Sequence, residues 1–133
     1  MKFDNEKHKT SINFDIKTYD IDIAGHVSNI VYIKWLEVLR FKLFEKFLPI
    51  DKLLKEDLYP VVISTNIIYK KQLKLLDNPS GFIWIENIQH NMIFLKFRFM
   101  TGNNICAFAE QKCILMNLKK DVMDKVKLKT LVV

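Results

Sequence analysis

The chain has 133 residues, half of them hydrophobic, a size and composition that suit one domain with a single sizeable core. Its formal charge of +6 and its pI of about 9.3 would suit an anionic partner, such as nucleic acid, a membrane surface or a phosphate-bearing small molecule, although a lysine-rich composition explains them equally well. The aromatic residues fall mostly at expected core positions, which argues against nucleic acid. We expect one domain over residues 1–133, with a loose leader at 1–10 and an uncertain tail at 118–133.

The chain carries no sequence signal for export or for a membrane. Its first ten residues are charged rather than apolar, so they contain no secretory segment. A membrane span needs about 18–20 apolar residues, and Lys34, Glu37 and Arg40 interrupt the most apolar stretch. These features predict a soluble, cytoplasmic protein without a membrane span.

Two cysteines, Cys106 and Cys113, lie seven residues apart in apolar surroundings. Neither a second pair of cysteines nor a histidine stands at the spacing of metal ligands. We therefore expect two buried free thiols rather than a disulfide or a metal site.

A strand and a loop are predicted near the N-terminus. Apolar and polar residues alternate over residues 11–19, as they do in a half-buried strand. Residues 20–27 have no such periodicity and contain Gly25, which indicates a loop that crosses from the strand to the next element.

A long helix is predicted over residues 29–47. Ser28 or Asn29 can cap its start, because a short side-chain oxygen there can accept a hydrogen bond from a free backbone N–H. Pro49 ends it. The apolar residues of this helix cover more than one stripe, so we expect other structure to enclose it.

The second half of the chain predicts four further strands. Their β-branched, aromatic and alternating residues lie at 61–73, 82–89, 92–100 and 105–116. A hairpin turn is expected at residues 102–104. Short turns join antiparallel neighbours, so the chain predicts an α+β domain in which one long central helix packs with about five antiparallel strands.

The stretch from Asp20 to Glu37 carries a motif. It reads D-x-D-x-x-G-H-V-S-N-x-x-Y followed by an aromatic residue and an acid, formed by Asp20, Asp22, Gly25, His26, Val27, Ser28, Asn29, Tyr32, Trp35 and Glu37. This motif resembles that of the hotdog-fold acyl-CoA thioesterases, in the branch of the 4-hydroxybenzoyl-CoA thioesterases and the related acyl-ACP thioesterases. Ser28 alone departs from it, where the family usually has asparagine, and serine caps a helix equally well. A weaker resemblance extends over residues 11–117.

The resemblance implies a fold, an activity and an assembly. The fold would be a hotdog, in which an antiparallel sheet curls around the central helix. The activity would be hydrolysis of an acyl-CoA or acyl carrier protein thioester to an acid and a thiol, without a metal or another cofactor. The assembly would be a homodimer, or a dimer of dimers that forms a homotetramer, with active sites at the subunit interface.

Asp22 and Asn29 are the predicted catalytic residues. Asp22 matches the catalytic aspartate of the family, which acts as nucleophile or as general base. Asn29 lies at the first turn of the predicted helix, where free backbone N–H groups and the positive end of the helix dipole would polarise a thioester carbonyl. Without the motif, Asp22 would more often be a turn residue and Asn29 a helix cap.

Three residues of the motif are second-tier candidates: His26, Glu37 and Tyr32. We expect His26 to hold the loop by hydrogen bonds rather than to transfer a proton. Tyr32 would form part of the core or of a pocket wall. An unpaired carboxylate is costly in a buried helix, so Glu37 would be neutral, paired or directed into a polar cavity.

Four basic residues are candidates for binding the phosphates of CoA, because an exposed basic rim can hold an anion. They are Lys70, Lys71, Lys96 and Arg98. A solvated face of the sheet also explains them, and is the simpler interpretation for any one residue.

Two other functions fit parts of the sequence. A hotdog enoyl-thioester hydratase would need the block D-x-N-P-x-H, but residues 22–26 are one residue short and lack the Asn-Pro pair. A non-catalytic hotdog protein that binds an acyl group or an acyl carrier protein is consistent with the basic charge.

Overall fold

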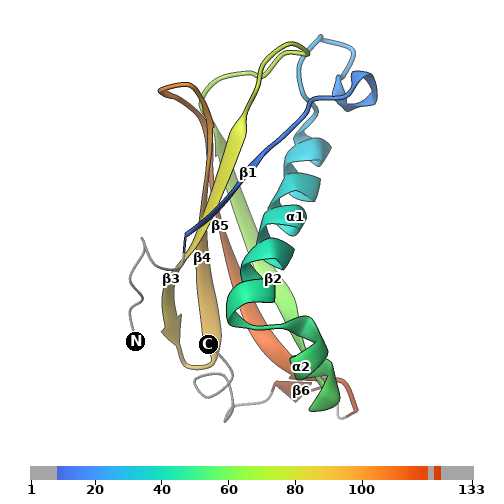
Figure 1. The fold of residues 1–133 in the computed structure, drawn as a ribbon, viewed down its shortest axis with the longest axis vertical. Helices are drawn as coiled ribbons and strands as arrows, with labels where there is room; N and C mark the ends of the chain where they lie inside the picture. The colour runs from blue at the N-terminus through green and yellow to red at the C-terminus, as the bar shows by residue number, and fades with distance from the viewer. Residues whose placement is uncertain (1–8, 120–121, 124–133) are drawn as a thin grey trace.

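The computed structural model describes residues 9–119 and 122–123 of the chain. Figure 1 shows one long helix, α1 (Asn29–Phe47), lying along one face of an antiparallel sheet, with a short helix, α2 (Ile50–Lys55), after it. The α+β prediction is therefore confirmed. No helix in this part of the chain is long and apolar enough to cross a membrane.

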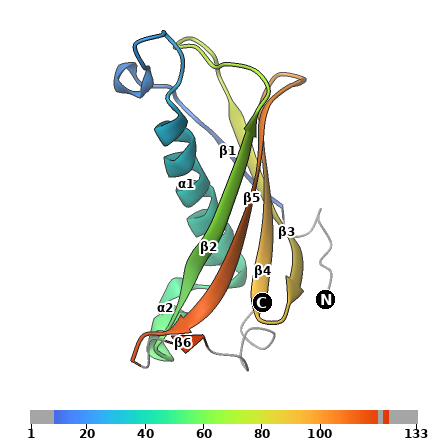
Figure 2. The same cartoon turned by 180° about the vertical axis from the view of Figure 1, so that it is seen from behind.

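The sheet has the strand order β1-β3-β4-β5-β2, and β6 pairs with the last residues of β5. Every pair is antiparallel. The strands are β1 (Thr10–Asn13), β2 (Leu58–Tyr69), β3 (Ser80–Gln89), β4 (Met92–Thr101), β5 (Asn104–Asn117) and β6 (Val122–Met123). Seen from behind in Figure 2, β2 lies beside β5 at one edge of the sheet. Within the described residues, β5 is the only strand that pairs with β2.

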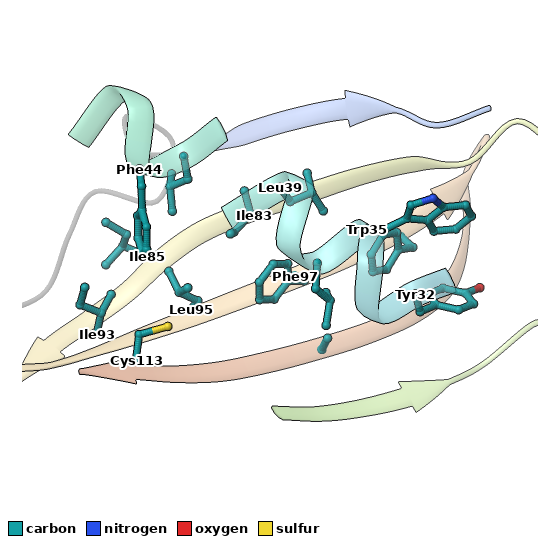
Figure 3. Close-up of a cluster of buried hydrophobic side chains, with 14 of the residues drawn as sticks. Tyr32, Trp35, Leu39, Phe44, Ile83, Ile85, Ile93, Leu95, Phe97 and Cys113 are labelled. Atoms are coloured by element: carbon teal, nitrogen blue, oxygen red, sulfur yellow. The ribbon is translucent and has the colours of Figure 1, made fainter. Parts of the chain in front are cut away.

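The core lies between α1 and the face of the sheet that α1 covers. The residues of β4 on this face are at most 1% exposed: Ile93, Leu95, Phe97 and Phe99. Lys96 and Arg98 alternate with them on the opposite face. In Figure 3, the buried β4 side chains gather with Leu39 and Phe44 of α1 in one cluster. The predicted alternation of this strand is therefore confirmed.

The long helix begins and ends where the sequence predicts. Ser28 is the N-cap, and its hydroxyl accepts a hydrogen bond from the Ile30 N–H at 3.3 Å. At the other end, the Leu48 N–H donates to the Phe44 carbonyl at 2.8 Å, and Pro49 then starts the turn into α2. Local signals at both ends are sufficient to fix these boundaries.

The prediction that other structure encloses α1 is wrong for the single chain. One face of the helix is buried on the sheet: Val31, Tyr32, Trp35, Leu36, Leu39, Leu43 and Phe44. On the remaining surface, four apolar residues are 45–67% exposed: Ile30, Ile33, Val38 and Phe41. The sheet lies on one side of α1 only, so a helix that is apolar all round keeps part of its apolar surface uncovered.

The first strand is shorter than predicted. β1 ends at Asn13, whereas the alternation predicted a strand over residues 11–19. The next residue across the ladder is Pro79, which has no N–H to donate. Phe14 still donates to the Pro79 carbonyl at 2.9 Å, and the chain then leaves the sheet for a 3₁₀ turn at Thr18–Asp20.

The strand after α2 also ends earlier than predicted, at Tyr69 rather than at residue 73. The N–H groups of Lys70 and Lys71 both donate to the Cys106 carbonyl, at 2.8 and 3.0 Å, so the regular ladder stops there. The following segment runs beside the loop that precedes α1 (Figure 1). The other three long strands match their predicted ranges closely.

Both cysteines are free and buried, as predicted. Burial raises the pKa of the Cys113 thiol to about 11. Of the predicted leader, residues 1–8 lie outside the described residues, and Thr10 already belongs to β1. Of the predicted tail, the structure describes residues 118–119 and the short strand β6, and the rest lies outside the described residues.

Candidate active site

The loop before α1 holds the Asp22 side chain by hydrogen bonds to its own backbone. Asp22 Oδ1 accepts from the Ala24 N–H at 2.9 Å and from the His26 N–H at 3.1 Å. The loop closes on itself through a bond from the Asp22 N–H to the His26 carbonyl at 2.8 Å. Gly25 adopts a φ of +83°, which glycine adopts without strain. One carboxylate oxygen is thus fixed, and none of these bonds uses the other.

Both ends of this loop are tied to their surroundings. Ile21 and Val27 form an isolated antiparallel bridge, and the Ser28 N–H donates to the Asp20 carbonyl at 2.9 Å. The Val27 N–H also donates to the Leu73 carbonyl at 2.8 Å, which joins the loop to the segment after β2. These bonds position Asp22 relative to both the helix and the sheet.

The first turn of α1 keeps a free backbone donor. The Ile30 N–H donates to Ser28 Oγ and the Val31 N–H to the Ser28 carbonyl, at 3.3 and 3.0 Å. The Asn29 N–H is the first of the helix, and no described residue accepts a hydrogen bond from it. It therefore combines a free donor with the positive end of the helix dipole.

A cavity of about 530 Å³ opens between this loop and the segment after β2. Its lining brings four of the predicted site residues together: Asp22, His26, Asn29 and Tyr32. Two of the predicted phosphate ligands, Lys70 and Lys71, lie on its opposite wall and are exposed. Val27, Tyr32 and Leu73 are the buried residues of the lining and form its floor. One cavity thus holds acidic, basic and hydrogen-bonding groups beside an apolar floor.

Tyr32 combines a buried ring with a hydroxyl to which no described residue forms a hydrogen bond. Its ring makes edge contacts with those of Trp35, Tyr69 and Phe99, at centroid distances of 5.3, 5.1 and 5.2 Å. Burial raises the pKa of Tyr32 well above its ordinary value and also raises that of Tyr69. Both phenols are therefore neutral hydrogen-bond donors at physiological pH.

Glu37 does not reach this cavity. Its side chain is 71% exposed and pairs with Arg40 at 3.3 Å, beside a separate cavity of about 150 Å³. The expectation that Glu37 lies in a buried part of the helix is therefore wrong. Of the three states predicted for its carboxylate, the structure shows the paired one. Arg40 also donates to the buried side chain of Gln111 at 2.9 Å, so the ion pair joins the helix to β5.

Lys96 and Arg98 lie on the face of the sheet that α1 does not cover. Lys96 pairs with Glu110 at 2.7 Å, and this hydrogen bond holds the pKa of Glu110 below its ordinary value. The Arg98 guanidinium lies 5.6 and 5.7 Å from the ring centroids of Phe82 and Trp84. Neither residue lines the cavity of Asp22, but Lys96 and Lys70 both line another cavity, of about 360 Å³.

A family model described as the thioesterase-like superfamily matches residues 16–130, which include the whole loop, α1 and both walls of the cavity. The chain belongs to the thioesterase-like superfamily. Membership places it among enzymes that hydrolyse thioesters and agrees with the resemblance carried by the motif from Asp20 to Glu37. No curated protein matches the sequence.

Several solved structures share the fold of this superfamily member. A DHNA-CoA thioesterase from Staphylococcus aureus is 15% identical, with a TM-score of 0.80 over 88% of this chain and 80% of that one. YbaW, a probable thioesterase from Escherichia coli, is 20% identical, with a TM-score of 0.79 over 91% of both chains. The protein SAV2348 from Staphylococcus aureus, solved in complex with CoA, is 14% identical, with a TM-score of 0.78 over 87% and 75%. At these identities the likeness shows the hotdog fold, which the motif predicted.

The sequence did not identify three residues that line the cavity of this superfamily member: Tyr69, Gln72 and Leu73. They follow one another at and beyond the end of β2, far along the chain from Asp22. The pair Lys70–Lys71 was the only signal in this segment, because charge marked it as a possible anion site. A hydrogen bond from the Val27 N–H to the Leu73 carbonyl joins this segment to the loop. No pattern in the sequence predicts this bond.

Proposed function

We propose that this protein hydrolyses acyl-CoA thioesters with Asp22 as its catalytic carboxylate. The observation that carries the proposal is that Asp22 and Asn29 line one cavity. Asp22 has one oxygen fixed by two backbone N–H groups and a second oxygen outside these bonds. Asn29 supplies a free donor at the start of a 19-residue helix.

The reaction follows from these two groups. A thioester carbonyl oxygen that accepts a hydrogen bond from the Asn29 N–H would become more electrophilic at carbon, and the helix dipole would stabilise the developing oxyanion. Asp22 would then attack the carbonyl carbon and expel the thiolate, leaving an acyl-aspartyl anhydride that water hydrolyses. Alternatively, Asp22 would take a proton from water as the water attacks. In both routes the thiolate leaves and is protonated, and no metal or other cofactor takes part.

Lys70 and Lys71 give the cavity a basic rim suited to the phosphates of CoA. Both side chains are exposed and lie across the cavity from Asp22. A structure with the same fold was solved in complex with CoA. An acyl carrier protein is the other carrier that could present the thioester.

A second copy of the chain would complete the site. The uncovered apolar residues of α1, with Ile30 and Phe41 67% and 54% exposed, lie beside the open edge of β2, where Ile63 and Ile68 are 48% and 52% exposed. An open strand edge beside exposed apolar residues suits self-association. A homodimer through this surface, alone or as half of a homotetramer, would bring the partner close to the cavity at Tyr69, the last residue of β2.

The test is thiol release from a panel of acyl-CoA and acyl carrier protein thioesters that differ in chain length. We expect Asp22→Ala and Asp22→Asn to lower kcat by about 10²–10⁴. Asp15→Asn is the matched control, because Asp15 is an exposed aspartate outside the cavity. Activity that survives in both Asp22 variants would contradict the mechanism. Binding without hydrolysis by the parent protein would favour a non-catalytic acyl-binding function instead.

A further inference from the structure

The face of the sheet that α1 does not cover, the outer face, carries four aromatic side chains: Phe82, Trp84, Phe94 and Phe108. Residues directly opposite each other in a ladder share a face. Phe82 and Phe108 both lie opposite Arg98. None of the four rings belongs to the core, and no described helix lies on this face (Figures 1 and 2). The expectation that aromatic residues lie mostly in the core therefore does not hold for the outer face.

Basic side chains lie beside these rings. The Lys9 ammonium lies 5.0 and 5.8 Å from the ring centroids of Phe82 and Trp84, the same two rings that the Arg98 guanidinium approaches. The Lys112 ammonium lies 5.8 Å from the ring centroid of Phe94. A ring attracts each cation, but cations that share a ring pair repel each other. An anion bound to both Lys9 and Arg98 would relieve this repulsion.

Basic side chains outnumber acidic ones on the outer face. Glu110 pairs with Lys96, and Glu86 accepts a hydrogen bond from the Trp84 indole at 3.0 Å. The three other cations form no ion pair with any described residue: Lys9, Arg98 and Lys112. The outer face is therefore complementary in charge to an anionic partner, in a chain whose net charge is +6.

The Arg98 guanidinium is open to a partner from outside the chain. Its Nε is buried and has no hydrogen-bond acceptor. Its two terminal nitrogens are not buried, and no described residue accepts a hydrogen bond from them. A guanidinium presents its donors as a planar fork, which matches the oxygens of a phosphate. Arg98 thus holds unused donors beside two aromatic rings.

Two cavities of about 360 Å³ each hollow the outer face. Both are lined by Asn66, Lys96 and Glu110, so they adjoin. One extends to Phe94 and Lys112 and reaches β3, and the other extends to Phe108 at the side of β2. Together they form a groove across the strands, with aromatic and basic side chains along it. Such a groove suits an extended anionic chain.

We propose that the outer face binds single-stranded nucleic acid, with phosphates at Lys9, Arg98 and Lys112 and bases stacked on the aromatic rings. Proteins that bind single strands combine a basic groove that follows the phosphates with aromatic side chains that stack on the bases, in several cases on a sheet. This inference goes beyond the proposed thioesterase function and does not depend on it, because the binding assay below uses no thioester.

Other anionic partners fit the outer face less well. The rings of Phe82, Trp84 and Phe94 are half-buried, so they cannot insert into a bilayer as the aromatic residues of interfacial helices do. A second copy of the chain would bring the same basic face against itself, and like charges repel. A nucleic-acid base needs only one accessible side of a ring to stack on.

The test is binding of a fluorescent oligouridylate of about 12 nucleotides, measured by anisotropy at low and at physiological salt. We expect the oligouridylate to bind more tightly than duplex DNA or polyglutamate, because neither of these has free bases. No binding at low salt, or equally tight binding of duplex DNA or polyglutamate, would overturn the inference. Sedimentation with phosphatidylglycerol vesicles and no binding of the oligouridylate would also overturn it, in favour of a lipid surface.

A pair of lysine substitutions tests whether the outer face carries the phosphates. Lys9→Gln with Lys112→Gln removes two cations and keeps the rings, so we expect Kd to rise about tenfold and its dependence on salt to become less steep. Lys46→Gln with Lys52→Gln is the matched control, because it removes two exposed cations from the helices α1 and α2. Equal effects of the two pairs would show that net charge alone drives binding and would overturn the inference.

Trp84→Leu tests the stacking. It removes one ring of the outer face and should raise Kd by about tenfold with the salt dependence unchanged. Tyr19→Leu is the control, because it removes an 82% exposed ring from outside the outer face and should leave Kd unchanged. Circular dichroism checks that both variants are folded. A folded Trp84→Leu variant with the Kd of the parent would overturn the assignment of the rings as a stacking surface.

Discussion

The two ends of α1 differ in their surroundings: one adjoins a cavity and the other is buried in the core. At its start, a polar cavity of about 530 Å³ adjoins the free Asn29 N–H and the exposed carboxylate of Asp22. At its end, α2 closes over the core, and the residues there are at most 2% exposed: Leu43, Phe44, Leu48, Leu53 and Leu58. The Leu48 N–H donates to the Phe44 carbonyl at this closed end, whereas the Asn29 N–H at the open end has no acceptor in the described part of the chain.

The difference shows that one helix can separate stability from chemistry along its length. The closed end contributes hydrophobic burial, and a cavity of only about 150 Å³ lies beside it. At the open end, Asp22, Asn29 and Tyr32 line a cavity. Substitutions at the closed end should therefore change the free energy of unfolding, and those at the open end should change turnover.

The largest expected effect on stability is at the closed end. Leu43→Ala removes a fully buried side chain and should lower the free energy of unfolding by about 2–5 kcal/mol. Leu54→Ala is the matched control, because Leu54 is 46% exposed on α2 and should change stability by less than about 0.5 kcal/mol. Urea unfolding followed by circular dichroism measures both. Equal effects of the two substitutions would show that the closed end is not the more tightly packed region.

A smaller loss is expected at Gly81 of β3, which packs against Leu39 of α1. A Cβ added at Gly81 of β3 would lie 2.6 Å from Phe14 Cε2 and 2.9 Å from Leu39 Cδ1. Gly81→Ala forces these core groups to move and should destabilise the protein by about 1–3 kcal/mol. The same unfolding measurement tests Gly81→Ala. Ala107→Ser is not a suitable control, because Ala107 is itself buried. Unchanged stability in Gly81→Ala would show that the helix can shift on the sheet without cost.

Substitution of the helix cap is expected to change both stability and turnover. Ser28→Ala removes the acceptor of the Ile30 N–H and should cost about 1 kcal/mol of stability. It should also lower kcat, because Ser28 orients the first turn that carries the Asn29 N–H. Ser28→Asn restores a capping side chain and should return both properties close to those of the parent. A kcat that Ser28→Ala leaves unchanged would argue against the helix start as the carbonyl-polarising group.

Local patterns in the sequence predicted the helix α1 and the loop before it well, and the ends of strands less well. The cap at Ser28 and the break at Pro49 fixed α1, because both act within one helical turn. The motif residues Asp22, His26 and Asn29 meet in one cavity because they follow one another in a single tight loop. Strand ends were predicted less well. β1 stops at Pro79 and β2 stops at the Cys106 carbonyl, and both partners are distant in the sequence.

The sequence did not predict on which face some side chains lie, because this depends on tertiary structure. Glu37 was expected in a buried part of α1, but the sheet covers only one side of the helix, and Glu37 lies on the other. Lys96 and Lys70 looked alike in the sequence, but only Lys70 lines the cavity of Asp22, although both line another cavity, of about 360 Å³. The contribution of Leu73 to the cavity depends on its hydrogen bond with Val27, which the sequence pattern does not show.

The smallest expected effect concerns the two lysines at the rim of the Asp22 cavity. Lys70→Ala and Lys71→Ala remove exposed charges from the cavity rim, and an exposed pair with a phosphate contributes about 0.2–1 kcal/mol, so KM for an acyl-CoA should rise by up to about fivefold. Lys96→Ala is the matched control, because Lys96 does not line the cavity of Asp22 and its ammonium already pairs with Glu110. Salt screens exposed charges, so the difference in KM should shrink as ionic strength rises. A rise in KM for Lys96→Ala equal to that for the rim lysines would place the CoA phosphates on the outer face of the sheet and would contradict the assignment of the open end of α1 as the substrate entrance.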